Sequence, residues 1–211
     1  MRDFGSRRVA ASEVPHSPMG RPKKFTRSEA LHKAKDLFRK QGYHATSIDD
    51  LVRALGVNRA SLYETFGGKR ELFGEVLRNY TTESLQTVRE FLAGQTSVRE
   101  GFRRLFLYNL DEMKAGKATV GCLAVNTTTE LLPADRTVTA DLVANRNNAE
   151  AVFAEFIERG IAQGEVGRNK DAKAIAAFLF TFNHGLSVLA KLQSGREELV
   201  RSIDVALKAF D

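Results

Sequence analysis

Apolar side chains recur along the chain with the spacing of an α-helix. In residues 48–55, the apolar residues Ile48, Leu51, Val52 and Leu55 occupy positions i, i+3, i+4 and i+7, so a helix here buries one apolar stripe. The same period continues beyond Leu72, and the whole chain has only four prolines. We therefore predict an all-α fold of about nine helices, with a three-helix N-terminal domain and a larger helical C-terminal domain.

The start and end of the helix over residues 48–55 can be read from its flanking residues. Thr46 or Ser47 is a suitable N-cap. If Thr46 is the cap, Asp49 falls at the third helical position, where its carboxylate can reach back to the cap amide. Gly56 ends the helix because glycine readily adopts the left-handed conformation that a sharp turn requires.

The residues after that glycine predict a turn and a second short helix. Val57 is an apolar plug for the turn, and Asn58 is a good cap for a helix from about Arg59 to Thr65. Leu62 and Phe66, four residues apart, face inward. This arrangement is typical of a helix-turn-helix, whose second helix enters the major groove of DNA.

The second helix carries the residue types that major-groove recognition needs. A groove about 12 Å wide admits a helix with short side chains and hydrogen-bond donors at its N-terminal end. Arg59 can donate two hydrogen bonds to a guanine, and Ala60 can contact a thymine methyl group. Ser61 and Thr65 can serve bases or phosphates. The candidates better suited to phosphates are Thr46, Ser47, Tyr63 and Lys69.

The stretch GYHATSIDDLVRALGVNRASLYETFGGKRELF, residues 42–73, resembles the DNA-binding signature of the tetracycline-repressor (TetR) family of one-component bacterial transcription factors. The resemblance covers Gly42 and Tyr43, residues 46–48, the turn at Gly56 and Val57, Leu62 and Tyr63, Phe66, and residues 69–73. Members usually carry Ser, and often Gly, where this chain has Asn58 and Ala60, and often His in place of Thr65. These departures affect which bases are read and leave the fold assignment intact.

The resemblance implies a repressor that binds a pseudo-palindromic operator in double-stranded DNA as a homodimer. Two recognition helices about 34 Å apart read such a site with more discrimination than one. The resemblance also implies release by an unknown small molecule or electrophile, which would favour one hinge state of the ligand domain and so change that spacing.

Charge divides the chain into a basic N-terminal part and a nearly neutral remainder. Residues 1–80 hold 16 Lys or Arg against 9 Asp or Glu, whereas residues 81–211 hold 16 against 17. The basic part is therefore the part expected to bind DNA. We assign residues 1–24 to a flexible basic arm, 25–72 to the helix-turn-helix domain and 73–211 to a ligand-binding and dimerisation domain. The arm either adds salt-dependent affinity for DNA or serves only as a solubilising tail.

The sequence favours a cytoplasmic protein without a membrane partner. It lacks the continuous apolar region of a secretory signal, and its longest apolar run, AIAAFLFTF from Ala174, meets Asn183 and His184 before it could cross a bilayer. A single cysteine, Cys122, excludes an intrachain disulfide and fits a reducing compartment.

The last two expected helices suggest the dimer interface. Residues 172–192 are almost all apolar or small, so a helix there needs cover on two sides. One side can pack on the domain core, and the other can meet the same helix pair of a second subunit in a four-helix bundle. The predicted interface residues are Phe182, Gly185, Leu186, Leu189, Leu199, Ile203 and Leu207.

An effector pocket can be placed only by the inward stripes of the later helices. Aromatic residues with a few polar groups are typical of small-molecule pockets. The candidates are Phe102, Phe106, Asn109, Cys122, Asn126, Phe153, Phe156, Phe178, Phe182 and Asn183, with His184 as a further polar residue. Core packing is the alternative for each phenylalanine, and a satisfied interface position is the alternative for His184.

Cys122 has a second interpretation. Its segment, GCLAVNTTTEL, resembles a glycine-cysteine-leucine element in a subset of TetR-family ligand domains, some of which sense electrophiles or oxidants through a cysteine. A thiol at the first turn of a helix has its pKa lowered by the backbone amides and becomes a better nucleophile. The alternative is an inert cysteine acting as a small apolar residue.

Three classes of function remain to be compared: an effector-responsive repressor, an architectural DNA-binding protein without an effector, and an enzyme in the C-terminal helices. The sequence has no zinc-spaced Cys and His set and no phosphate-binding GxxxxGK[ST] or GxGxxG motif. Cys122 and His184 would be a nucleophile and a base without an evident third group. We therefore expect a regulator that is not an enzyme and needs no metal or cofactor.

Overall fold

A computed structural model describes residues 26–114, 121–192 and 195–211, and over these residues the chain forms nine α-helices, two short 3-10 helices and no strand. The prediction of an all-α fold is confirmed. The predicted basic arm, residues 1–24, lies outside the described residues. The helices are α1 (Arg27–Gln41), α2 (Ile48–Leu55), α3 (Arg59–Phe66), α4 (Lys69–Ala93), α5 (Val98–Lys114), α6 (Leu123–Leu131), α7 (Arg136–Gln163), α8 (Ala172–Leu189), η1 (Ala190–Leu192), α9 (Arg196–Ala206) and η2 (Leu207–Phe210).

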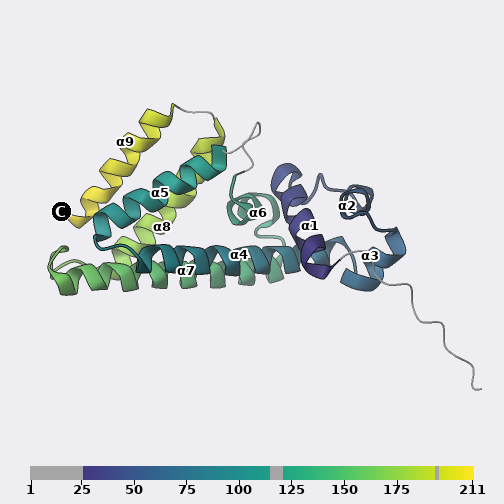
Figure 1. Cartoon of the computed structure of the whole chain (residues 1–211), viewed down its shortest axis with the longest axis horizontal. Helices are drawn as coiled ribbons and strands as arrows, with labels where there is room; N and C mark the ends of the chain where they lie inside the picture. The colour runs from purple at the N-terminus through teal and green to yellow at the C-terminus, as the bar shows by residue number, and fades with distance from the viewer. Residues whose placement is uncertain (1–25, 115–120, 193–194) are drawn as a thin grey trace, which may run out of the picture.

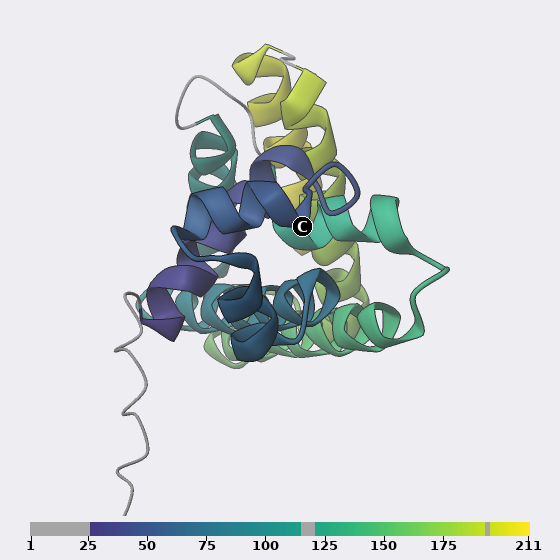
Figure 2. The same cartoon turned by 90° about the vertical axis from the view of Figure 1, so that its right-hand side faces the viewer.

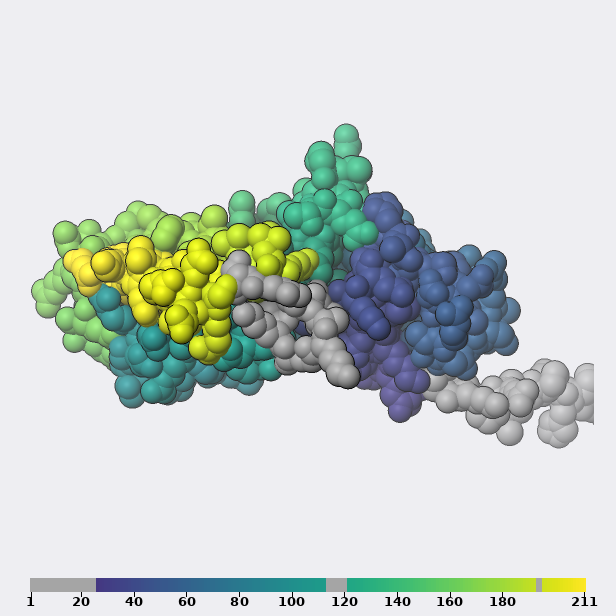
Figure 3. All heavy atoms as spheres, turned by 90° about the horizontal axis from the view of Figure 1, so that it is seen from above, coloured from purple at the N-terminus to yellow at the C-terminus, as the bar shows by residue number. Residues whose placement is uncertain are grey.

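The molecule is elongated, with α4 and α7 lying side by side along its length (Figure 1). Helices α1 to α3 form one end, which we call the reading head, and α5, α8 and α9 gather at the other end. Figure 2 looks onto the reading head from its outer side. In the space-filling view, α9 and the reading head lie at opposite ends of the visible surface (Figure 3). The helix α6 lies between the two ends and contacts α1, α4, α7 and α8.

The core of the reading head extends into the C-terminal half of the chain. Its buried apolar side chains come from α1 to α4, with Phe38, Leu51, Leu62 and Leu72 fully buried. The same cluster includes residues of α6 and of the start of α7, namely Leu123, Ala124, Leu131, Val138 and Leu142. The reading head is therefore packed directly against α6 and α7.

A second core fills the space between α5, α7, α8 and α9. At its centre, the ring of Phe102 meets Phe153 edge-on at a centroid distance of 5.0 Å and lies 5.4 Å from the ring of Phe156. Gly101 allows this packing, because a Cβ atom there would lie 2.7 Å from the Phe156 ring. Close-packed interiors leave no room for such an atom without a shift of the ring.

The segment Ala172–Leu192 is long and apolar enough, by length and composition, to cross a membrane. Only 33% of its most apolar window is buried within the subunit. The core helix of a soluble protein passes the same test, and α8 packs on α5, α7 and α9. Its uncovered apolar side chains need another surface.

Candidate nucleic-acid interface

Helix α2 begins with a capping box that resolves the choice between Thr46 and Ser47. Ser47 is the N-cap: its hydroxyl accepts a hydrogen bond from the Asp50 amide at 3.1 Å, and the Ser47 amide donates to the Asp50 carboxylate at 3.0 Å. The third helical position is thus held by Asp50, and not by Asp49. The side chain of Thr46 is fully buried, and its hydroxyl donates to the Gly42 carbonyl at 2.6 Å. The expectation that Thr46 contacts a phosphate is therefore corrected: its hydroxyl supports the turn before α2.

The turn and the second helix follow the sequence expectation. Gly56 has φ 70° and ψ 32°, the left-handed conformation that ends α2. The Asn58 side chain accepts a hydrogen bond from the Ser61 amide at 2.7 Å and caps α3. Leu62 and Phe66 are buried in the core of the reading head. Burial of these two residues turns the opposite face of α3 to solvent.

The solvent face of α3 carries three of the predicted DNA-binding residues. Arg59, Ala60 and Tyr63 are exposed, with Tyr63 at 47%. Ser47 is exposed at the start of α2, whereas Ser61 and Thr65 are half-buried. The face is therefore a helix N-terminus with a guanidinium, a methyl group and a phenol hydroxyl, the kind of surface that fits a major groove.

Arg59 already has an anionic partner in the free chain. Its guanidinium donates to the Asp49 carboxylate at 2.7 Å, which raises the pKa of Arg59. The two side chains are 59% and 71% exposed, so solvent screens the pair. Arg59 can therefore exchange this carboxylate for a base edge or a phosphate on DNA.

Lys69 and Arg27 link separate segments at the reading head. The Lys69 ammonium donates to the Thr46 carbonyl at 2.6 Å and lies 4.3 Å from the centre of the Tyr43 ring. This engagement places Lys69 in the support of the α1–α2 loop, although it was predicted as a phosphate contact. Arg27 donates to both carboxylate oxygens of Glu75 and to the Thr65 carbonyl at 2.9 Å, so it joins the start of α1 to α3 and α4. Sequence reasoning missed Arg27 because its partners are 38 and 48 residues away.

Polar contacts join the reading head to α6 and α7. The Glu130 carboxylate accepts hydrogen bonds from the amides of Tyr43, at 2.9 Å, and His44, at 2.6 Å. Arg39 donates to the Gly121 carbonyl at 3.2 Å. These contacts fasten the C-terminal end of α1 and the loop after it to α6.

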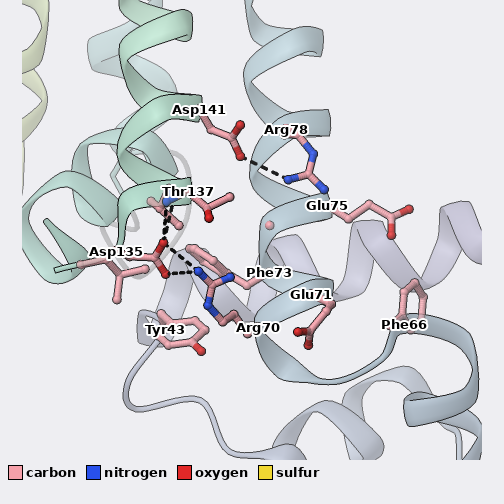
Figure 4. Close-up of a pocket in the computed structure, with 13 residues that line it drawn as sticks. Tyr43, Phe66, Arg70, Glu71, Phe73, Glu75, Arg78, Asp135, Thr137 and Asp141 are labelled. Atoms are coloured by element: carbon pink, nitrogen blue, oxygen red, sulfur yellow. Dashed lines mark hydrogen bonds and ion pairs between the residues drawn. The ribbon is translucent and has the colours of Figure 1, made fainter. Parts of the chain in front are cut away.

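A pocket of about 300 Å³ lies between the first turns of α4 and α7 (Figure 4). Buried apolar side chains, including Phe73 and Val138, form part of its lining. Two ion pairs cross it from α4 to the α7 side: Arg70 with Asp135 at 2.8 Å, and Arg78 with Asp141 at 3.2 Å. No local sequence pattern indicates this pocket, because its lining comes from segments that only the fold brings together.

Comparison with known proteins fits this geometry. The family model described as "Bacterial regulatory proteins, tetR family" matches residues 30–76, and the model "Tetracyclin repressor-like, C-terminal domain" matches residues 100–206. The chain belongs to the TetR family. It is thus a helix-turn-helix transcriptional regulator, and the sequence resemblance is confirmed.

Individual TetR relatives align over most of the chain. The uncharacterized HTH-type transcriptional regulator YezE of Bacillus subtilis (strain 168) is 31% identical over 194 residues, which cover 92% of this chain and 100% of the relative. The HTH-type transcriptional repressor ComR of Escherichia coli (strain K12) is 30% identical, covering 90% of this chain and 91% of ComR. A solved structure of a cysteine mutant of the TetR-family regulator CifR, complexed with a 26 bp double-strand operator DNA, is 34% identical. It superimposes with a TM-score of 0.81 over 90% of this chain and 100% of that chain.

Only some of the residues predicted for the dimer interface of this TetR protein are exposed on the subunit surface. Leu186, Leu199, Ile203 and Leu207 are buried in the subunit's own core, so their assignment to an interface is corrected. Leu189 and Gly185 are exposed, and Phe182 is half-buried. The large apolar side chains that α8, η1 and α9 expose are Phe178, Val188, Leu189, Leu192 and Val205. The apolar stripe of Leu199 and Ile203 on α9 was predicted to contact the partner subunit, but in the structure it packs on α5 and α8.

The predicted effector-pocket residues lie in several different parts of the structure. Phe102, Phe106, Phe153 and Phe156 are buried and packed on one another in the second core. The Asn109 amide donates to the Asn183 side chain at 3.2 Å between α5 and α8. Phe178 and Phe182 line an outer groove of about 380 Å³ beside α9. Cys122 and Asn126 lie elsewhere, on the segment of α6 that faces the reading head.

Cys122 and His184, weighed above as a nucleophile and a base, have separate partners. Cys122 is the half-buried N-cap of α6, and its sulfur accepts a hydrogen bond from the Tyr80 hydroxyl at 3.5 Å. Burial is the main cause that raises the pKa of Tyr80, which keeps this hydroxyl a donor. The His184 and Phe180 rings are tilted at 42° with centroids 4.1 Å apart, and a His184 ring nitrogen is hydrogen-bonded to the Phe180 carbonyl at 3.0 Å. Burial lowers the pKa of His184. The sensor interpretation of Cys122 stays a prediction.

Proposed function

We propose that the protein is a repressor that binds a pseudo-palindromic operator as a homodimer, in the cytoplasm, and that an effector releases it. The observation that carries this proposal is the exposed N-terminal face of α3, held by the Asn58 cap and by the burial of Leu62 and Phe66. The proposed contacts are Arg59 and Ala60 to bases, Ser61 and Thr65 to bases or phosphates, and Ser47 and Tyr63 to phosphates. The operator complex of CifR, a relative of similar fold, supports this reading.

Homodimerisation is supported by the apolar face of α8, η1 and α9. Exposed apolar side chains in a patch of this kind mark an interaction surface, and Leu192 is 70% exposed and Val205 62% exposed. A two-fold axis through this patch would let one surface cover its own copy. The two α3 helices would then meet two half-sites.

An architectural DNA-binding protein is the alternative function. The test is a selection of preferred duplexes from a random pool, followed by fluorescence-anisotropy titration of the selected site and of a random duplex at physiological salt. A specific repressor prefers its site by about a thousandfold or more. Equal affinity for the two duplexes would favour the architectural function.

Substitution of Arg59 tests the role of α3 directly. Loss of a bidentate base contact weakens specific binding by about 1–3 kcal/mol and relaxes one position of the site. Arg59→Ala is therefore expected to lose affinity for the selected site more than for random DNA. The matched control is Arg168→Ala, an exposed arginine in the loop between α7 and α8. Equal losses by Arg59→Ala on both duplexes would remove Arg59 as a base-reading residue.

The proposal includes no enzymatic step. Cys122 and His184 are engaged by Tyr80 and Phe180, respectively. Among the residues that the structure describes, no group of three or more His, Cys, Asp or Glu could hold a metal ion. The chain's chemistry is thus better suited to binding.

A further inference from the structure

A cleft of about 280 Å³ opens between the C-terminal end of α1, α6 and η1. Arg39 and Lys40 line it from the reading head, and Lys191 lines it from η1. Glu130 is the only carboxylate in its described lining. Three cations against one carboxylate give the cleft an excess of positive charge.

The carboxylate of Glu130 does not neutralise these cations directly. Both of its oxygens accept hydrogen bonds from backbone amides, those of Tyr43 and His44. The Lys191 ammonium donates to the neutral side chain of Asn126. Lys40 is exposed to solvent. The cationic groups of the cleft therefore have no hydrogen bond to a carboxylate among the described residues.

Arg39 carries a donor that the fold leaves unsatisfied. One terminal nitrogen of its guanidinium donates to the Gly121 carbonyl, and the guanidinium carbon lies 5.9 Å from the centre of the Tyr80 ring. Its Nε is buried and has no hydrogen-bond partner among the described residues. A buried donor without a partner is costly, and an ordered water or an anion is one way to satisfy it.

We propose that this cleft binds a small anion through a carboxylate or phosphate group. A guanidinium and an ammonium group from α1, with a second ammonium group from η1, suit an acceptor with several oxygens. The volume of about 280 Å³ lies just below the range of about 300–1,000 Å³ for small-molecule sites, which favours a compact ligand. The lining includes no residue of α2 or α3, so the occupant is a free anion and not the DNA that α3 contacts.

The position of the cleft gives the anion a regulatory role, which rests on the proposed function of operator binding. A ligand held by Arg39 and Lys40 on one side and Lys191 on the other joins α1 to η1. The anion therefore binds more tightly to an orientation of the reading head that brings these cationic groups together than to one that separates them. Because such coupling is reciprocal, the bound anion changes the protein's affinity for the operator by the same factor by which the bound operator changes its affinity for the anion.

Calorimetric titration of the full-length protein with inorganic phosphate, and separately with citrate, tests the site. In each titration the probe anion replaces chloride, so that the ionic strength stays constant. The cleft variant is Lys40→Gln with Lys191→Gln. The matched control is Lys33→Gln with Lys173→Gln, which removes two exposed charges from α1 and α8 outside the cleft. We expect at least one probe to bind the wild type and the control with similar affinity. The affinity of the cleft variant for that probe should be lower by about tenfold or more. No binding by either probe, or equal binding by all three proteins, would overturn the proposal.

Operator titration with and without the probe tests the coupling. The bound anion is expected to change the operator affinity of the wild type and the control by about fivefold or more, and to leave that of the cleft variant unchanged. An equal change in all three proteins would refute the coupling. A loss of operator affinity by the cleft variant in chloride alone, without anion binding by the wild type, would identify DNA phosphate as the occupant and overturn the proposal. Operator binding by the wild type in chloride tests the proposed function separately.

Discussion

Removal of the Glu130 carboxylate should loosen the reading head from α6. The carboxylate accepts hydrogen bonds from the Tyr43 amide at 2.9 Å and the His44 amide at 2.6 Å, and these amides belong to the loop between α1 and α2. Gly42 lies against the same carboxylate: a Cβ atom there would be 2.9 Å from Oε2. In Glu130→Ala both amides lose their partner, whereas the Glu130→Gln side chain still offers one oxygen.

The size of the effect follows from the two bonds. A hydrogen bond to a charged group contributes about 1.5–3 kcal/mol, and the lower value applies because one amide is half-buried and the other is exposed. Glu130→Ala should therefore lower the free energy of unfolding by about 3 kcal/mol, and Glu130→Gln by about half of that. For a chain of this length, the melting temperature should fall by about 6–12 °C and about 3–6 °C, respectively.

Circular dichroism melts and urea titrations measure both quantities on the same samples. Glu158→Ala is the matched control because Glu158 is an exposed carboxylate on α7, and exposed substitutions change stability by about 0.5 kcal/mol or less. A Glu130→Ala melting temperature equal to that of this control would refute the reasoning, because the two hydrogen bonds would then make no net contribution. A larger loss for Glu130→Gln than for Glu130→Ala would also contradict it.

Three further predictions follow from the same contacts. Val205→Asp should convert the homodimer to a monomer, measured by light scattering after gel filtration, because Val205 is 62% exposed on the apolar face. The control Ala151→Asp, at an exposed position of α7, should stay dimeric. If both variants are dimeric, the interface does not include Val205. Hydrogen bonds from the Ser47 hydroxyl and amide lower the pKa of Asp50, so their stabilisation is present above the ordinary pKa of aspartate, about 3.9, and is lost as pH falls towards the folded-state value. Urea titrations between pH 5 and pH 3 should therefore show a smaller loss of stability for Asp50→Asn than for wild type, and equal slopes would disprove this role. A mild electrophile should release operator from the wild type and not from Cys122→Ser if this thiol is a sensor, and identical release would show that it is not.

Local rules were sufficient to predict the fold and the helix-turn-helix. The helical period identified α2, Gly56 ended it in the left-handed conformation, and Asn58 capped α3. These features depend on residues within a few positions of one another, so a sequence displays them directly. The cap of α2 was left open between Thr46 and Ser47 because both side chains can accept the same hydrogen bond, and burial of Thr46 decides for Ser47.

Contacts between distant segments could not be predicted in the same way. Glu130 is 87 residues from Tyr43, and Arg27 is 48 residues from Glu75. The stripe that contains Leu199 and Ile203 has the same period whether it faces its own subunit or a partner. Periodicity identifies the face that is buried, but it does not identify what covers that face.

The helix α6 is the element through which we infer that the C-terminal half of the chain controls the reading head. Leu123 and Leu131 of α6 belong to the core of the reading head, and Glu130 holds the loop after α1. A movement of the reading head that left α6 in place would expose Leu131 and break both Glu130 hydrogen bonds, each at a cost in free energy. A movement of α6 together with α1 keeps these contacts, but it shifts the packing of α6 on α7 and α8 and the ion pairs across the pocket in Figure 4, which are half exposed on their arginine sides. The screened ion pairs contribute little and both Glu130 hydrogen bonds are kept, so we expect an effector to act on the reading head by moving α6 and α1 together.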